Sequence, residues 1–298
     1  MTTNDLEQDL PRILYILGTA RSGSTILEIL LASDPKAFGA GEITFLPKDG
    51  LVRDRECSCH HPVSTCEVWG RVLKQLVLAN GALKSWVSLQ HKVDWHLGFF
   101  RQLLSCIPIK HFHEYELYNK NLFVAIKQAT NCSVVIDSSK YAGRALAVNR
   151  IMGRNMSVIC LTRSPDGLMN SFKKPNKEEQ RPKTPLKTLV YYVLTLTSLR
   201  ITCAKLGKCV HQLRYEELIS NPVGSLEKIE SWRGFDLSIA KQHVKNKRPL
   251  DVGHIVTGNR LRKNGQVVFK SSKDEYFVGR WEKFVIGIMQ VWKWILRF

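Results

Sequence analysis

Apolar runs of strand length alternate with helix-like stretches through much of this chain. Strands are predicted at residues 13–17, 133–136, 157–162 and 210–215. Helices, in which apolar positions recur every three to four residues, are predicted at residues 26–31, 143–152, 165–172 and 186–206. Alternation of this kind favours a parallel sheet covered by helices on both faces. The pattern therefore predicts an α/β protein with a central parallel sheet.

The stretch from about residue 50 to residue 130 interrupts this alternation. It starts irregularly and then shows helical periodicity, with no strand pattern in between. Helices are expected over residues 71–79, 95–107 and 114–129. We expect this block to be a helical insertion that lies beside the functional site and shapes it.

Three later segments have patterns of their own. Residues 173–185 combine prolines with many charges, which is typical of an exposed mobile loop that could act as a lid. Residues 253–265 combine glycines with basic side chains and suit a loop that touches phosphate. Residues 284–298 are apolar and aromatic, so they are expected to pack on the body of the protein. An interfacial membrane helix or an oligomer contact is the alternative.

Composition and charge narrow the choice of partner. The 298 residues, 44% of them hydrophobic, can form a sizeable core, and a single domain over residues 1–298 is expected. The 44 Lys and Arg against 26 Asp and Glu give a formal charge of +18, which favours a polyanionic partner. The basic residues are dispersed and not interleaved with aromatic residues. We therefore expect a small ligand with several phosphates and no nucleic acid.

The sequence also predicts a compartment. The first residues are acidic and lack both the positive and the apolar region of a secretory signal. Four cysteines lie in or beside apolar runs, as buried free thiols do in a reducing compartment: Cys132, Cys160, Cys203 and Cys209. No stretch reaches the roughly 20 apolar residues of a membrane-spanning helix. A cytoplasmic protein without a transmembrane segment is expected.

A strand–loop–helix phosphate site is predicted at residues 18–25. The sequence Gly-Thr-Ala-Arg-Ser-Gly-Ser-Thr has the glycine spacing of a Walker loop, in which backbone N–H groups and a helix N-terminus hold phosphate. Ser24 stands where that motif has lysine, and Arg21 supplies the positive charge instead. Because the Walker lysine reaches the β- and γ-phosphates of ATP or GTP, a different phosphate donor is indicated.

A second phosphate contact is predicted after the strand at residues 157–162. Arg163 ends that strand and Ser171 follows on or near the next helix. Both should lie at the carboxyl edge of the sheet, where α/β folds bind ligands. Arginine offers a planar, permanently charged fork to a phosphate, and a serine hydroxyl adds another donor.

These segments together resemble the sulfotransferase family, whose members use 3′-phosphoadenosine 5′-phosphosulfate (PAPS). Residues 21–25 look like the family's 5′-phosphosulfate loop, and Arg163 with Ser171 looks like its 3′-phosphate site. Arg-Tyr-Glu-Glu-Leu at residues 214–218, with Asn-Pro after it, and the basic stretch at residues 258–262 follow in the family's order. The motif style is similar to the carbohydrate and tyrosylprotein branches.

The resemblance implies a P-loop-like α/β domain and a set of donor-binding residues. These are Arg21, Ser22, Gly23, Ser24, Thr25, Arg163, Ser171, Tyr215 and Arg262. By this resemblance Tyr215 would lie against the adenine, and Arg262 would close over the 3′-phosphate, with Arg260 and Asn259 ranked after it.

The resemblance also implies the catalytic residues. Glu42 stands in a Gly-Glu pair that carries the catalytic carboxylate in those branches, and it would accept the proton of an acceptor hydroxyl or amine. A helix-cap or surface role is its alternative. Lys140 resembles a lysine placed over the sulfate, where it and Arg21 would offset developing negative charge. No metal is required for this chemistry, and His113 and His254 rank below Glu42 as bases.

Cysteines gather near the start of the helical block. Cys57, Cys59 and Cys66, with His60-His61, are residue types that could bind zinc, but the spacing is compressed and a second well-spaced pair is missing. Zinc, a disulfide and free thiols all stay open. Similar segments in bacterial sulfotransferase-like proteins imply a structural clip near the acceptor side.

Two other functions compete with sulfuryl transfer. A small-molecule kinase with a degenerate Walker loop would bind ATP with magnesium, which the missing lysine disfavours. A basic protein without enzyme activity would bind nucleic acid or a membrane surface, with an affinity that falls steeply with salt. The acceptor, expected to be a small molecule or a carbohydrate, and the oligomeric state have no recognisable signal.

Overall fold

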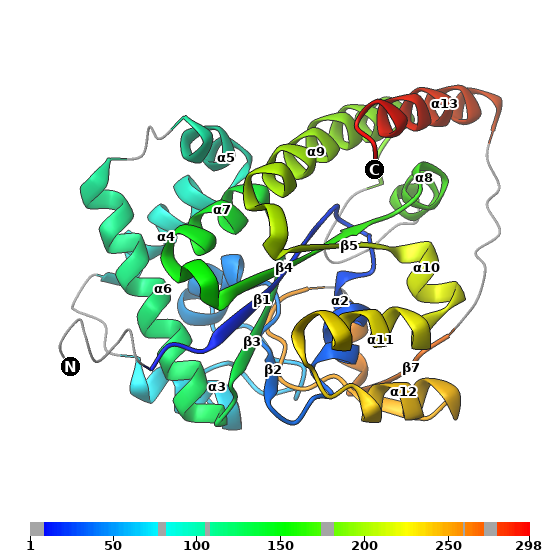
Figure 1. The fold of residues 1–298 in the computed structure, drawn as a ribbon. Helices are drawn as coiled ribbons and strands as arrows, with labels where there is room; N and C mark the ends of the chain where they lie inside the picture. Colours follow the sequence, from blue (N-terminus) through cyan, green and yellow to red (C-terminus); the bar gives the residue numbers. More distant parts are fainter. Residues whose placement is uncertain (1–8, 77–81, 105–107, 174–181, 259, 271–278) are drawn as a thin grey trace.

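A five-stranded parallel sheet forms the centre of the computed structural model, which describes residues 9–76, 82–104, 108–173, 182–258, 260–270 and 279–298 (Figure 1). The strands are β1 (Arg12–Gly18), β2 (Ala37–Gly39), β3 (Val134–Lys140), β4 (Met156–Thr162) and β5 (Val210–Arg214). Their order in the sheet is β2-β3-β1-β4-β5, and every pair is parallel. The predicted α/β class and parallel sheet are confirmed.

The central strand, β1, is buried on both faces. Tyr15 and Leu17 enter one hydrophobic cluster, whereas Leu14 and Ile16 enter another. Successive side chains of a strand point to opposite faces, so a strand that is apolar at every position needs cover on both sides. The apolar run that marked this strand in the sequence is therefore also the reason for the layered fold.

Helices cover the two faces of the sheet (Figure 1). The cluster on one face draws on α3 (Glu67–Gln75), α4 (Ala82–Asp94), α5 (His96–Leu103), α6 (Ile109–Thr130), α7 (Ala142–Met152), α8 (Pro165–Lys173), α9 (Pro185–Leu206) and α13 (Arg280–Ile295). The other draws on α2 (Ser24–Leu31), α10 (Tyr215–Ser220), α11 (Pro222–Arg233), α12 (Ser238–Lys245), and an antiparallel pair of β6 (Pro249–Asp251) and β7 (Gln266–Val268). Short helical turns complete the described chain: η1 (Ile43–Phe45), η2 (Leu46–Val52), η3 (Gly153–Asn155), η4 (Gly207–Cys209) and η5 (Arg260–Asn264).

The block at residues 50–130 is helical, as expected, but its helices differ from the predicted ones. α4 was not anticipated, although Trp86, Leu89 and Val93 are buried at helical spacing. α6 begins at Ile109, earlier than predicted, and α5 ends at Leu103. Part of the predicted helix at residues 71–79 lies outside the described residues. Each of these helices packs apolar side chains against several neighbouring helices. Its apolar positions therefore do not form the single stripe from which the ends of a helix can be predicted.

Two long apolar helices, α9 and α13, lie side by side in the structure (Figure 1). By length and composition alone, residues 185–209, with a mean hydropathy of 1.2, would be long enough to cross a membrane, which the sequence patterning did not anticipate. Of the 18-residue window in that stretch to which this hydropathy refers, 33% is buried within the protein. α13 buries Val285, Ile286 and Met289, as expected of a helix that packs on the body, whereas its Trp281 and Trp294 are exposed.

The remaining differences concern loops. The predicted phosphate loop at residues 253–265 contains η5 and is flanked by β6 and β7, which were not predicted. α10 was also missed. Most of the predicted mobile loop at residues 173–185 lies outside the described residues.

Candidate functional site

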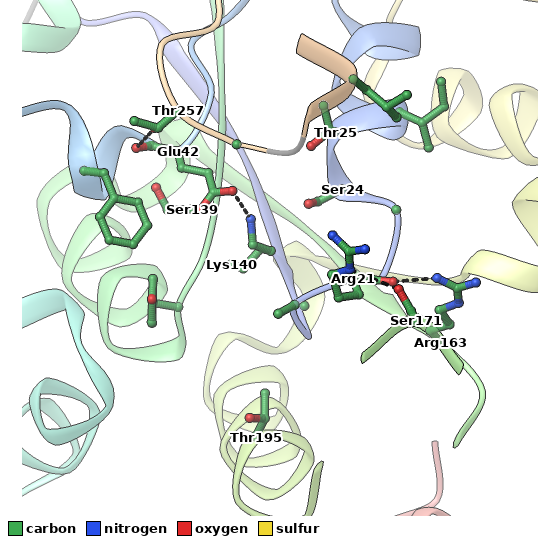
Figure 2. A pocket seen from close by; sticks show the side chains of 18 of the residues that line it. Arg21, Ser24, Thr25, Glu42, Ser139, Lys140, Arg163, Ser171, Thr195 and Thr257 are labelled. Atoms are coloured by element: carbon green, nitrogen blue, oxygen red, sulfur yellow. Dashed lines mark hydrogen bonds and ion pairs between the residues drawn. The ribbon is translucent and has the colours of Figure 1, made fainter. Parts of the chain in front are cut away.

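A cavity of about 760 Å³ opens at the carboxyl edge of the sheet, where β1, β3 and β4 end (Figure 2). The strand register aligns Leu17 with Lys140 and Gly18 with Leu161, so the segments that follow these strands meet at one place. Ten of the predicted site residues line the cavity: Arg21, Gly23, Ser24, Thr25, Glu42, Lys140, Arg163, Ser171, Tyr215 and Arg262.

Of the three further candidates for donor binding, Ser22, Asn259 and Arg260, the structure describes only the side chain of Ser22, which does not line the cavity. Ser22 is fully buried behind the loop, and its hydroxyl has no hydrogen-bond partner among the described residues. Asn259 and the side chain of Arg260 lie outside the described residues. Of the two histidines that ranked below Glu42 as bases, neither His113 nor His254 lines the cavity, whereas His96 does.

The loop between β1 and α2 has the backbone expected of an anion-binding turn. Gly23 has a φ of 91°, and a Cβ there would come within 2.5 Å of the Tyr215 ring, so only glycine fits. Arg21 is also left-handed, with a φ of 67°. The first N–H groups of a helix have no partner within it, and Ser24 and Thr25, which open α2, line the cavity.

Arg21, Arg163 and Ser171 meet at one end of the cavity (Figure 2). Arg21 Nε donates to Ser171 Oγ at 3.0 Å, and Arg163 Nη1 donates to the Arg21 carbonyl at 2.9 Å. The Arg163 guanidinium also lies 4.3 Å from the centre of the Tyr215 ring. The structure thus brings together four residues that the sequence separates by up to 194 positions.

Glu42 and Lys140 face each other on the other side of the cavity (Figure 2). Glu42 Oε1 lies 2.5 Å from Lys140 Nζ, and both side chains are about 15% exposed. The Glu42 carbonyl accepts a hydrogen bond from Thr257 Oγ1 at 2.9 Å. Lys140 ends β3 with a φ of 72°. A carboxylate held in this way can accept a proton, and the ammonium group beside it can stabilise negative charge.

A buried carboxyl group that the sequence analysis missed holds the backbone behind this pair. Glu28, on α2, is fully buried; Gly41 N donates to its Oε1 at 2.6 Å, and Ser138 Oγ donates to its Oε2 at 2.6 Å. Gly41 precedes Glu42, and Ser138 lies two residues before Lys140. Glu28 therefore connects the phosphate-loop helix to both residues. The signal in the sequence is a single acidic residue within an otherwise apolar helix.

A second buried network fixes the end of β3 from the opposite face of the sheet. Arg144 Nε donates to Asp137 Oδ2 at 2.7 Å, and its Nη1 donates to Asp94 Oδ2 at 3.1 Å, with all three side chains fully buried. Thr44 Oγ1 donates to the same Asp94 oxygen at 2.6 Å. Removing one partner of a buried ion pair leaves an uncompensated charge, which is strongly destabilising. The network restrains the backbone on which Glu42 and Lys140 stand.

Glu28 is expected to make the stability of the protein depend on pH. Burial raises the pKa of the Glu28 carboxyl from an ordinary 4.5 to about 7, against its two hydrogen bonds, which lower it. Between these values the folded state keeps a proton that the unfolded state has lost, so the free energy of unfolding falls as pH rises from about 4.5 to about 7. Glu28→Gln should flatten that slope, as measured by urea denaturation at several pH values.

The matched control is Glu227→Gln, on the exposed face of α11, which should keep the slope of the unmodified protein. A Glu28→Gln protein with an unchanged slope would mean that another group titrates in this range.

The profile of the Sulfotransferase family matches residues 11–238. No curated protein matches the chain significantly.

Several solved structures match the chain. Sulfotransferase STF1 from Mycobacterium tuberculosis is 15% identical, with a TM-score of 0.50 over 81% of this chain and 72% of that one. The sulfotransferase domain from the curacin biosynthetic pathway is 16% identical, with a TM-score of 0.48 over 94% of this chain and 98% of that one. Mouse sulfotransferase SULT7A1, solved in complex with PAP, is 12% identical, with a TM-score of 0.46 over 97% and 89%.

The family match begins just before β1 and ends at the first residue of α12, so it includes all five strands of the parallel sheet and the loop at residues 18–25. Because the family profile matches well over half of the residues of this chain, the chain belongs to the sulfotransferase family.

Proposed function

We propose that this protein transfers a sulfuryl group from PAPS to a hydroxyl or amine of an acceptor and releases adenosine 3′,5′-bisphosphate. The observation that carries this proposal is the single cavity at the carboxyl edge of the sheet. It places the N-terminus of α2 and the connected side chains of Arg21, Arg163 and Ser171 in the same space as the Glu42–Lys140 pair. Membership of the sulfotransferase family supports the same donor.

The charge of the cavity suits a donor with several phosphate and sulfate oxygens. Its basic lining side chains are Arg21, Arg55, Lys140, Arg163, Lys183 and Arg262, and its acidic ones are Glu42 and Asp49. The N-terminus of α2 with Arg21 would hold the 5′-phosphosulfate, and Arg163 with Ser171 and Arg262 the 3′-phosphate. Charge-assisted hydrogen bonds of this kind are roughly twice as strong as neutral ones.

In the proposed reaction the acceptor oxygen or nitrogen attacks sulfur as Glu42 takes its proton. The bond between sulfur and the bridging oxygen breaks, and the electron pair leaves with the 5′-phosphate. Lys140 and Arg21 stabilise the negative charge that develops there.

The acceptor would enter past an aromatic wall next to Glu42. Phe45, His96 and Tyr141 line the cavity, and Phe45 and His96 lie 6.1 Å and 5.4 Å from the Tyr141 ring, between ring centres. His96 belongs to α5, so the helical block contributes to this wall. Rings of this kind favour an acceptor with an apolar or ring-shaped face, such as a small aromatic molecule or a sugar.

A thermal-shift comparison tests the donor. Adenosine 3′,5′-bisphosphate at about 100 times its Kd should stabilise the protein by about 2.7 kcal/mol, a rise in Tm of roughly 5 °C, without magnesium. ATP with magnesium and adenosine 5′-phosphate at the same concentrations should give smaller shifts, because neither fills the 3′-phosphate site.

The two competing functions give different outcomes in the same assay. A larger shift with ATP and magnesium would favour a kinase. Equal, salt-sensitive shifts with all three nucleotides would favour general polyanion binding. Either result would overturn the proposed donor.

A further inference from the structure

Three cysteines and one histidine meet in a cluster apart from the cavity. The cluster consists of Cys57, Cys59, Cys66 and His254, whose ligand atoms all lie within 4.8 Å of one another. None of the four lines the cavity. We propose that these side chains bind one zinc ion, with a structural role.

Local turns bring the three cysteines together. An isolated bridge between Glu56 and Pro62 closes the segment, and Cys57 N donates to the His61 carbonyl at 2.8 Å. Cys66 stands at the start of α3, where its N–H donates to the Pro62 carbonyl at 2.8 Å. The compressed spacing in the sequence is therefore the spacing of one tight turn that ends in a helix.

The fourth ligand, His254, comes from a distant part of the chain. Hydrogen bonds hold its own backbone and that of the residues on either side of it. Trp69 Nε1 donates to the His254 carbonyl at 2.6 Å. Ser58, between two of the cysteines, donates through its hydroxyl to the Gly253 carbonyl at 2.5 Å and accepts from Ile255 N at 2.8 Å. The hydrogen bonds hold the imidazole beside the thiols, with Cys66 Sγ 3.2 Å from His254 Nδ1.

The separations fit a tetrahedral zinc site better than a disulfide. Zinc–sulfur bonds of about 2.3 Å and zinc–nitrogen bonds of about 2.0 Å place neighbouring ligand atoms about 3.5–3.8 Å apart. Cys59 Sγ and Cys66 Sγ lie 3.6 Å apart, whereas a disulfide requires about 2.0 Å. None of the three cysteines is part of a disulfide in the structure. A disulfide, one of the alternatives left open by the sequence, is therefore not formed here.

The ligand set itself selects zinc and a structural role. Three thiols and one imidazole are the Cys3His set of closed zinc sites, which have four protein ligands and no open position for substrate. Cys57 and Cys66 are each only 1% exposed. The neighbouring histidines do not take part: His60 Nδ1 lies 2.8 Å from Glu56, and His61 Nδ1 lies 2.9 Å from the Cys59 carbonyl.

The zinc ion would join two segments that form one wall of the cavity. After His254 the chain reaches Thr257, which donates to the Glu42 carbonyl, and then Arg262. Arg262 Nη1 in turn donates to the carbonyl of Glu56, the residue before the first cysteine, at 3.0 Å. A metal ion at this point would hold the basic segment that follows His254 and includes Arg262 against the body of the protein.

Metal analysis of the full chain tests the proposal. The protein, expressed with zinc in the medium and dialysed against metal-free buffer, should contain close to one zinc per chain by inductively coupled plasma mass spectrometry. Exchange with cobalt should give the charge-transfer and visible bands of tetrahedral cobalt–thiolate coordination. Both measurements use the unmodified protein and do not depend on whether a variant folds.

Variants identify the ligands. Cys59→Ser and His254→Ala should lose most of the zinc, whereas His254→Cys, which restores a ligand, should keep it. The matched controls Cys209→Ser and His243→Ala remove the same residue types elsewhere and should keep one zinc per chain. Folded unmodified protein without zinc, a loss of two hydrogens by mass that marks a disulfide, or equal zinc in Cys59→Ser and Cys209→Ser would overturn the proposal.

Discussion

Glu42→Gln is expected to lower kcat for sulfuryl transfer by about 10²–10⁴-fold, the usual contribution of a positioned general base. Glutamine has nearly the same shape but cannot take up the acceptor's proton. Affinity for adenosine 3′,5′-bisphosphate should stay the same or rise slightly, because the variant removes a negative charge from a basic cavity. Initial rates with radiolabelled PAPS and the best acceptor from a panel of sugars and phenols give the first quantity, and calorimetric titration the second.

Asp49→Asn is the matched control, since Asp49 is the other carboxylate that lines the cavity. It should keep far more activity than Glu42→Gln. A Glu42→Gln protein with undiminished kcat would exclude Glu42 as the base, and a parallel loss of bisphosphate affinity would give Glu42 a structural role.

Arg163→Ala is expected to weaken binding of adenosine 3′,5′-bisphosphate by roughly 10- to 100-fold, because hydrogen bonds to charged groups contribute about 1.5–3 kcal/mol. Binding of adenosine 5′-phosphate, which lacks the 3′-phosphate, should change much less. Calorimetric titration of both nucleotides measures the difference.

Two further variants make this experiment specific. Arg154→Ala removes an exposed arginine on η3 and should leave both affinities unchanged. Arg163→Lys keeps the positive charge but loses the planar, forked guanidinium. Its affinity for adenosine 3′,5′-bisphosphate should therefore lie between that of Arg163→Ala and that of Arg154→Ala. Because Arg163 also donates to the Arg21 carbonyl, equal weakening of both nucleotides would mean that it supports the loop and does not contact the 3′-phosphate.

The sequence predicted the structure best where a short local pattern is typical of one kind of element, such as a buried parallel strand and the loop that follows it. The apolar run before Gly18 predicted a buried parallel strand, and the loop after it predicted a helix N-terminus at the cavity. Arg163 was predicted at the carboxyl edge because it directly follows another such strand, and it lies there. Parallel strands end at the same edge, so short motifs that follow them meet even when they are far apart in the chain.

Long-range contacts could not be predicted in this way. Glu28 falls within the helix predicted at residues 26–31 and had no predicted role, and only the fold shows that its carboxyl group accepts hydrogen bonds from Gly41 N and Ser138 Oγ. His254 joins the cysteines from 188 residues beyond Cys66, whereas the adjacent His60 and His61 face other partners. The predicted strand ended at residue 136, whereas β3 continues to Lys140, because its polar side chains are buried in networks that a single strand does not reveal.

The late position of one wall of the cavity has a consequence for synthesis of the protein. Thr257 and Arg262 are reached only after the central sheet and its loop have been made, and they complete a cavity whose lining begins at Gly18. Before the ribosome adds His254, the three cysteines near residue 60 have already emerged without their histidine. Such a nascent chain can pair the strands of its sheet but cannot yet enclose a nucleotide, so the ability to bind one should arise only after Arg262 has been made and has joined the cavity.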